Sequence, residues 1–216
     1  MKKSFVFIDG NNLYYRIKSV ADYFLKENKQ EYGTVDFNFK EFYNSFKDDT
    51  DLKEIHYYVG QIKRLKNENS RDFLKAEKMY ASQQRLAGYL QNDGISLKYG
   101  KLLKYPGGVY HEKGVDVQIA VEMIRFARQN KYDVAYLLSS DSDLIPAVKE
   151  VKSLGKDVVY IGVKRVPTPE QLKAFQEQKK DPYAISYGLM KTTTDNRIIE
   201  KEQVFPFLKP KERKLF

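Results

Sequence analysis

Short runs of consecutive apolar residues alternate with amphipathic stretches along most of the chain. The runs at 5–8 and 134–138 are uninterrupted, as expected for parallel strands covered by helices on both faces. A helical pattern follows each of them, at 13–24 and 144–154. This alternation predicts an α/β fold with a mostly parallel central sheet and helices on both faces, a three-layer sandwich.

The same pattern predicts the order of the elements. Strands are expected at 4–8, 55–59, 95–99, 134–138 and 158–162, and helices at 13–24, 39–46, 71–91, 115–128 and 144–154. The strand at 158–162 is expected to close the regular part, because residues 185–207 show no clear period. We therefore divide the chain into one domain of residues 1–165 and a C-terminal extension, 166–216, packed on the same domain.

Composition narrows the chemistry. With 216 residues the chain can bury one good core. The lack of cysteine excludes disulfides, thiolate metal sites and a cysteine nucleophile, and two histidines disfavour a histidine-rich zinc centre. The first apolar run has only four residues, too short for a signal peptide, and no run is long enough to span a bilayer. We expect a cytoplasmic protein without a membrane partner.

Acidic residues stand where apolar runs end. Asp9 follows the first run, Asp141 and Asp143 follow the run at 134–138, and Asp116 lies at the start of the helix at 115–128. In open α/β sheets, chemistry collects at the carboxyl edge of the strands. Two carboxylates ~4 Å apart repel by roughly 4 kcal/mol, so a cluster requires protons or a cation. Oxygen ligands suit Mg²⁺ or Mn²⁺, and such a metal suits phosphodiester hydrolysis.

Each acid also has a simpler interpretation. Asp141 or Asp143 can serve only as a helix N-cap, Asp116 can merely begin its helix, and Asp9 can belong to a turn. For one isolated aspartate this interpretation is the better one. The coincidence of three separate segments at one expected edge favours a site.

Net charge indicates a polyanionic partner. The formal charge of +9 and the pI near 9.3 suggest nucleic acid. Lysines alternate with tyrosines over residues 97–113, around a predicted hairpin turn at 106–108, and can hold phosphates while the tyrosines stack on bases. A solvated hairpin whose tyrosines pack on its own base is an equally good interpretation. The candidate nucleic-acid-binding residues are Lys98, Lys101, Lys104, Tyr105 and Lys113, with Lys63 and Arg64 after the strand at 55–59.

Three ordered segments resemble the signatures of the NYN domain, a branch of the PIN-like nucleases. They read FVFIDGNNLYY, KGVDVQIAVEMI and DVAYLLSSDSDLIPAV, and the resemblance covers roughly residues 4–162. It implies a metal-dependent ribonuclease, acting as an endonuclease on RNA with Mg²⁺ or Mn²⁺. By position, the implied catalytic residues are Asp9, Asn12, Asp116, Asp141 and Asp143, and the four aspartates among them are the implied metal ligands.

The chain departs from the family pattern at two positions. Six residues after Asp116 the family often has another aspartate, and this chain has Glu122. Six residues are about 600° of helix, so the two share a face only if Asp116 precedes the regular turns, which makes Glu122 a doubtful ligand. Ser140 replaces a common glycine in the third motif, while Ser139 is placed to orient Asp141.

Two other functions remain open. One is a non-catalytic RNA-binding or scaffold module on the same fold, since binding uses the same basic surface. The other is a phosphatase of the haloacid dehalogenase type, which ranks lower because it needs an acid at position 11, where the chain has Asn11. Association into homo-oligomers is compatible with the sequence.

Overall fold

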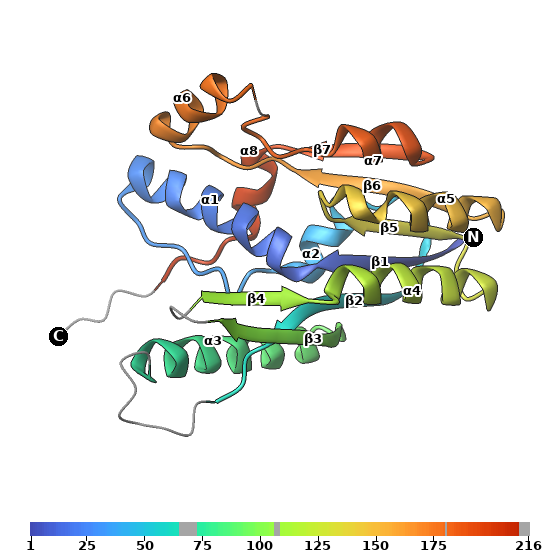
Figure 1. Ribbon diagram of the computed structural model, residues 1–216, viewed down its shortest axis with the longest axis horizontal. Coiled ribbons are helices and arrows are strands. Elements are labelled where there is room, and N and C mark those ends of the chain that lie inside the picture. The colour runs from blue at the N-terminus through green and yellow to red at the C-terminus, as the bar shows by residue number, and fades with distance from the viewer. Residues whose placement is uncertain (65–72, 106–108, 180, 212–216) are drawn as a thin grey trace.

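One twisted sheet runs through the whole molecule (Figure 1). The computed structural model describes residues 1–64, 73–105, 109–179 and 181–211, with residues 102–105 and 109–112 described in backbone only. In this part of the chain the sheet has seven strands in the order β4-β3-β2-β1-β5-β6-β7. Their bounds are β1 (Lys3–Asp9), β2 (Asp51–Gln61), β3 (Ser96–Tyr105), β4 (Val109–Lys113), β5 (Val134–Leu138), β6 (Asp157–Val163) and β7 (Asp195–Ile199).

Six strands are parallel, and only β4 pairs antiparallel, with β3. The helices are α1 (Gly10–Asn28), α2 (Phe39–Asn44), α3 (Phe73–Asn92), α4 (Val115–Arg128), α5 (Ile145–Ser153), α6 (Pro169–Glu177), α7 (Tyr187–Thr192) and α8 (Lys201–Val204), with short 3-10 turns η1 (Ser142–Leu144) and η2 (Phe205–Phe207). Among the described residues, no helix combines the length and apolar character needed to cross a bilayer. The predicted α/β fold with a mostly parallel sheet and helices on both faces is confirmed.

Alternation along each strand creates two cores. In β1, Val6 and Ile8 face one side of the sheet, whereas Phe5 and Phe7 face the other. The first core lies under α1, α2, α3 and α8, and the second under α4, α5 and α7. Nearly every side chain of β1, β5 and β6 is buried, which explains why these strands read as continuous apolar runs.

The regular structure does not end at β6. Beyond residue 166 the chain adds α6, α7, α8 and η2, and the strand β7 pairs parallel with β6. The expectation that the strand at 158–162 closes the regular part is therefore wrong. The strand β7 lies at the edge of the sheet, with a neighbouring strand on one side only, so fewer of its side chains are buried. Its sequence, DNRII, accordingly has only two apolar residues. The domain boundary after residue 165 stays a prediction.

The carboxyl ends of the parallel strands lie together at one edge, on the left in Figure 1. The helical elements that begin there include α1 directly after β1, α4 after β4, and η1 shortly after β5. The entry into α1 is tight, because the carbonyl of Gly10 accepts a 3.1 Å hydrogen bond from the Tyr57 hydroxyl of β2. This edge positions the candidate site.

We expect Gly10→Ala to destabilise the protein. A Cβ atom on Gly10 would lie 2.1 Å from the Tyr57 ring and 2.7 Å from the carbonyl oxygen of Tyr58. The ring or the start of α1 must move, at a cost of about 1–2 kcal/mol in the free energy of unfolding. Urea denaturation measures this. Gly88→Ala in α3 is the matched control, because a Cβ there meets nothing within 4 Å and should stabilise the helix by about 0.5–1 kcal/mol. Equal midpoints for both variants would contradict the packing argument.

Candidate metal and nucleic-acid site

A pocket at the carboxyl edge collects acidic side chains from three segments. Asp9 is the last residue of β1, Asp141 follows β5, and Asp116 lies in the first turn of α4. The pocket, here called the acid pocket, has a volume of about 370 Å³. It is lined by Asp9, Asn11, Asn12, Tyr15, Arg16, Val115, Asp116 and Asp141.

Three carboxylates at this edge form a compact group. Asp116, Asp141 and Asp143 each offer an oxygen, and these oxygens all lie within 4.8 Å of one another. At that separation each pair of ionised carboxylates repels by about 3–4 kcal/mol at an effective dielectric near 20. Asp143 is exposed, and the other two are half-buried. A group of hard oxygen ligands that is open to solvent fits a partly hydrated Mg²⁺ or Mn²⁺.

Asp9 lies beside this group but is already hydrogen-bonded. Its Oδ1 accepts a 2.9 Å bond from the backbone N–H of Asn12, which caps α1, and its Oδ2 accepts a 3.2 Å bond from the Ser139 hydroxyl. Burial raises the pKa of the Asp9 carboxyl, and the charge of Asp141 adds to the rise, whereas these two hydrogen bonds and the Arg16 cation lower it. The Asp9 carboxylate is thus ordered before any ligand arrives.

Ser139 connects the first and third motifs. Its hydroxyl donates to Asp9 and accepts a 3.1 Å bond from the backbone N–H of Asp141. Asp141 in turn caps η1, since its Oδ1 accepts a 2.9 Å bond from the backbone N–H of Asp143. The simpler interpretation of Asp141 as a helix N-cap is thus confirmed, and Asp9, for which the simpler interpretation was a turn, also caps a helix, α1. Both residues line the acid pocket as well.

A buried arginine that was not among the candidates from the sequence supports the same edge. Arg16 in α1 is 9% exposed and donates a 2.6 Å bond to the Ser140 hydroxyl and a 3.1 Å bond to the carbonyl of Ala184. The Ser140 hydroxyl donates to Asn12 Oδ1 at 3.1 Å. A signal existed, because Asp9, Asn12 and Arg16 are spaced for one side of a helix.

Glu122 is occupied by protein donors. Its Oε2 accepts a 2.8 Å bond from the Tyr58 hydroxyl and its Oε1 a 3.4 Å bond from Gln118. Asp116 already lies inside α4, so six residues rotate Glu122 away from it. Among the described acids, Glu122 is not part of the three-carboxylate group. These observations agree with the doubt about Glu122 as a ligand.

The candidate basic residues of the hairpin occupy both faces of the sheet. Lys98 lies on the α4 face of the sheet, on the same side as His56, whose ring stacks on Phe126. Burial and, to a smaller degree, the positive charge of Lys98 lower the pKa of His56. Side chains alternate along a strand, so Lys101 lies on the opposite face, and Lys113 is its direct partner in β4. The hairpin does not gather its lysines into one surface.

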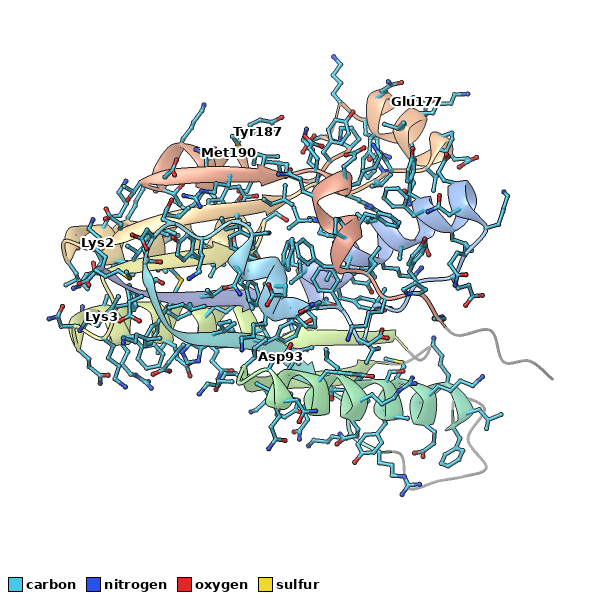
Figure 2. The ribbon with its side chains drawn as sticks, turned by 180° about the vertical axis from the view of Figure 1, so that it is seen from behind. Lys2, Lys3, Asp93, Glu177, Tyr187 and Met190 are labelled. Atoms are coloured by element: carbon cyan, nitrogen blue, oxygen red, sulfur yellow. The ribbon has the colours of Figure 1, made fainter. Side chains whose placement is uncertain are left out.

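The other basic candidates, Lys63 and Arg64, follow β2. Lys63 is exposed after β2, and the Arg64 Nε contacts Glu77 at 3.0 Å. Lys104 and Tyr105 lie in β3, but their side chains, like the turn at 106–108, fall outside the described residues. Figure 2 places Lys2 and Lys3 at the opposite, amino edge of the sheet, so not all of the basic charge lies near the acid pocket.

The fold and the acid pocket together define an α/β protein with a carboxylate-rich site at the carboxyl edge of a parallel sheet. A family profile of the NYN domain matches residues 3–181. The chain belongs to the NYN domain family, a branch of the PIN-like nucleases. The predicted resemblance is confirmed, and membership gives no support to the phosphatase alternative.

A solved structure shares the fold. It is a crystal structure of a protein of unknown function from Vibrio parahaemolyticus, 15% identical to this chain, with a TM-score of 0.55 and coverage of 96% of both chains. This likeness shows the architecture alone. A comparison with curated protein sequences finds no match.

Proposed function

We propose that the protein is a metal-dependent ribonuclease that hydrolyses internal phosphodiester bonds of RNA. The observation that carries the proposal is the group formed by Asp116, Asp141 and Asp143 at the carboxyl edge of an NYN domain. Asp9 completes the ligand set from the wall of the same pocket. The choice of RNA and of an internal cut rests on the family.

Asp116, Asp141 and Asp143 would hold Mg²⁺ or Mn²⁺, with Asp9 bound directly or through water. A metal at this place supplies activation of water and neutralisation of charge on the phosphate. The protein contributes order, because Ser139 fixes both the Asp9 carboxylate and the Asp141 backbone through one hydroxyl. The N-termini of α1 and α4 favour an anionic phosphate at this edge.

Asn12 would donate a hydrogen bond to the phosphate in the acid pocket, and Arg16 would add positive charge beside it. Asn12 accepts from Ser140 through Oδ1, so its amide nitrogen is the donor left for a phosphate oxygen. Arg16 brings a buried positive charge next to the negative charge of Asp9. Lys101 and Lys113 are the basic residues of the hairpin closest in register to the start of α4 and supply further attraction for the strand.

Cleavage assays test the proposal. Labelled linear RNA, hairpin RNA, circular RNA and single-stranded DNA are incubated with Mg²⁺, Mn²⁺ or EDTA, using the wild type and Asp116→Asn. We expect RNA to be cut only with metal, circular RNA to be opened, and the variant to lose more than about 100-fold in rate. RNA bound tightly but left intact with either metal would support the non-catalytic binding module instead. Equal cutting by both proteins would indicate a contaminating nuclease and overturn the proposal.

A further inference from the structure

A second cavity adjoins the acid pocket. This cleft of about 620 Å³ lies between α1 and α3, and its floor contains the buried side chains of Ile17, Phe39 and Tyr57. Both helices extend along the left side of Figure 1, where the parallel strands end. Its volume is in the range of cavities that hold organic ligands. Asn11 and Tyr15 line both cavities, so the cleft opens beside the acids.

The walls of the cleft carry exposed tyrosines. Tyr14, Tyr15 and Tyr89 are 39%, 57% and 42% exposed, so part of each ring is accessible to a ligand. Tyr14 and Tyr15 contact each other edge to face, and the Lys209 ammonium lies over the Tyr89 ring, 5.8 Å from its centroid. We name this cavity, with these three tyrosines, the tyrosine cleft. Aromatic rings stack on unpaired bases without regard to sequence, and this contact is a main source of affinity for single strands.

The cleft is preformed. Gln83 of α3 is 5% exposed, and its side chain bonds the backbone of β2 and the residue after it: Oε1 accepts from Ile62 N–H at 2.8 Å and Nε2 donates to the Gly60 carbonyl at 2.8 Å. These bonds fix α3 at a set distance from the sheet. A ligand therefore need not order the wall when it binds.

Charge in the cleft favours an anionic chain. Lys78 and Arg85 are exposed along α3, and Lys211 also lines the cleft and pairs with Glu31 at 3.1 Å. Asp36 is the acidic side chain among the lining residues. Basic groups beside exposed aromatic rings match a strand with a phosphate backbone and unpaired bases.

We propose that the tyrosine cleft binds unpaired bases of the RNA strand next to the phosphate held at the acid pocket. The inference rests on the proposed function and deepens it, because it names single-stranded RNA beside the cut as the recognised feature. Tyr15 stacks the first base beyond the shared opening, and Tyr89 stacks a base further along. Lys78 and Arg85 hold the phosphates between them.

Binding measured in EDTA tests the inference apart from cleavage. A labelled single-stranded RNA of about ten nucleotides, within the size range of single-strand sites, is titrated with the wild type, Tyr89→Ala and Tyr89→Phe. We expect Tyr89→Ala to weaken binding roughly tenfold and Tyr89→Phe to bind like the wild type, since the ring is retained. Tyr187→Ala is the matched control, because Tyr187 is 60% exposed on α7, a helix that packs on the second core, whereas the cleft lies on the first.

An RNA with abasic sites keeps its phosphate backbone but lacks the bases at those sites, so its affinity distinguishes base stacking from phosphate contacts. It should bind more weakly to the wild type and show no further loss with Tyr89→Ala. Wild-type affinity in both Tyr15→Ala and Tyr89→Ala, or no binding of single-stranded RNA by the wild type, would overturn the inference. If the wild type cuts RNA with metal while these variants bind normally, the inference fails and the nuclease stands. If binding depends on the tyrosines but no metal supports cutting, the inference stands and the nuclease fails.

Discussion

Asp141→Asn is expected to abolish metal-dependent cleavage while leaving the protein folded. The Oδ1 atom of Asp141 caps η1 by accepting from Asp143 N–H at 2.9 Å, and an asparagine oxygen can accept the same bond. The substitution therefore retains the turn and removes one negative charge from the group with Asp116 and Asp143. Losing a residue that only hydrogen-bonds a metal ligand typically costs about 10–100-fold in metal affinity or activity. Asp141 would be a ligand itself, so the cleavage rate and the Mn²⁺ affinity should fall by more than about 100-fold.

Stability in EDTA should not fall in this variant. The three carboxylates repel one another without a cation, so removing one charge should leave the melting temperature unchanged or slightly higher. Asp22→Asn makes the same chemical change on the exposed part of α1, where Asp22 pairs with Lys18, and should cut RNA normally. Calorimetric titration of Mn²⁺ and thermal melting check both points. Wild-type Mn²⁺ affinity in Asp141→Asn would remove Asp141 from the ligand set.

Arg16→Met is expected to lower both stability and activity. The substitution leaves the Ala184 carbonyl and the Ser140 hydroxyl without their charged donor and leaves the buried charge of Asp9 without a nearby cation. Charge-assisted bonds of this kind contribute about 1.5–3 kcal/mol, so we expect a loss of about 2–3 kcal/mol in the free energy of unfolding. Because Asn12 and Asp9 lose support, cleavage should also fall about 10–100-fold.

The measurement must separate positioning from simple destabilisation. Urea denaturation gives the stability, and Mn²⁺ titration well below the unfolding transition gives the affinity of the folded site. Arg16→Lys keeps the charge without the planar guanidinium and should be intermediate in both. Arg125→Met, on the exposed surface of α4, should stay within about 0.5 kcal/mol of the wild type. A stable, fully active Arg16→Met would show that the hydrogen bonds described here do not support the site.

The placement of the acids could be anticipated because it depends on topology. Apolar runs marked β1 and β5 as buried parallel strands, and residues that follow such strands reach one edge regardless of side-chain detail. The full set of hydrogen bonds that each acidic side chain makes could not be anticipated. The bond from Asn12 to Asp9 is an ordinary N-cap bond, which an aspartate before a helical pattern indicates. The bond from Ser139 joins two turns far apart in the sequence and depends on the backbone path of both.

The strand β7 and the tyrosine cleft are indicated only weakly by the sequence, or not at all. The strand β7 is short and half polar, so it lacks the apolar run that revealed β1, and only its pairing with β6 makes it a strand. The tyrosine cleft joins side chains from α1 and α3, which are far apart in the sequence. Conversely, the lysines of the hairpin are close in sequence but divided between two faces, since neighbours in a strand alternate.

Asp9 and Asp141 cap helical elements with the same carboxylates that line the acid pocket. A substitution at either position can therefore keep the helix cap, and with it the fold, and still remove a negative charge from the acid pocket. Asparagine or serine satisfies the cap but supplies no negative charge for a cation. In other NYN domains, an uncharged polar residue at the position of Asp141 should mark a chain that retains the fold and has lost metal-dependent turnover.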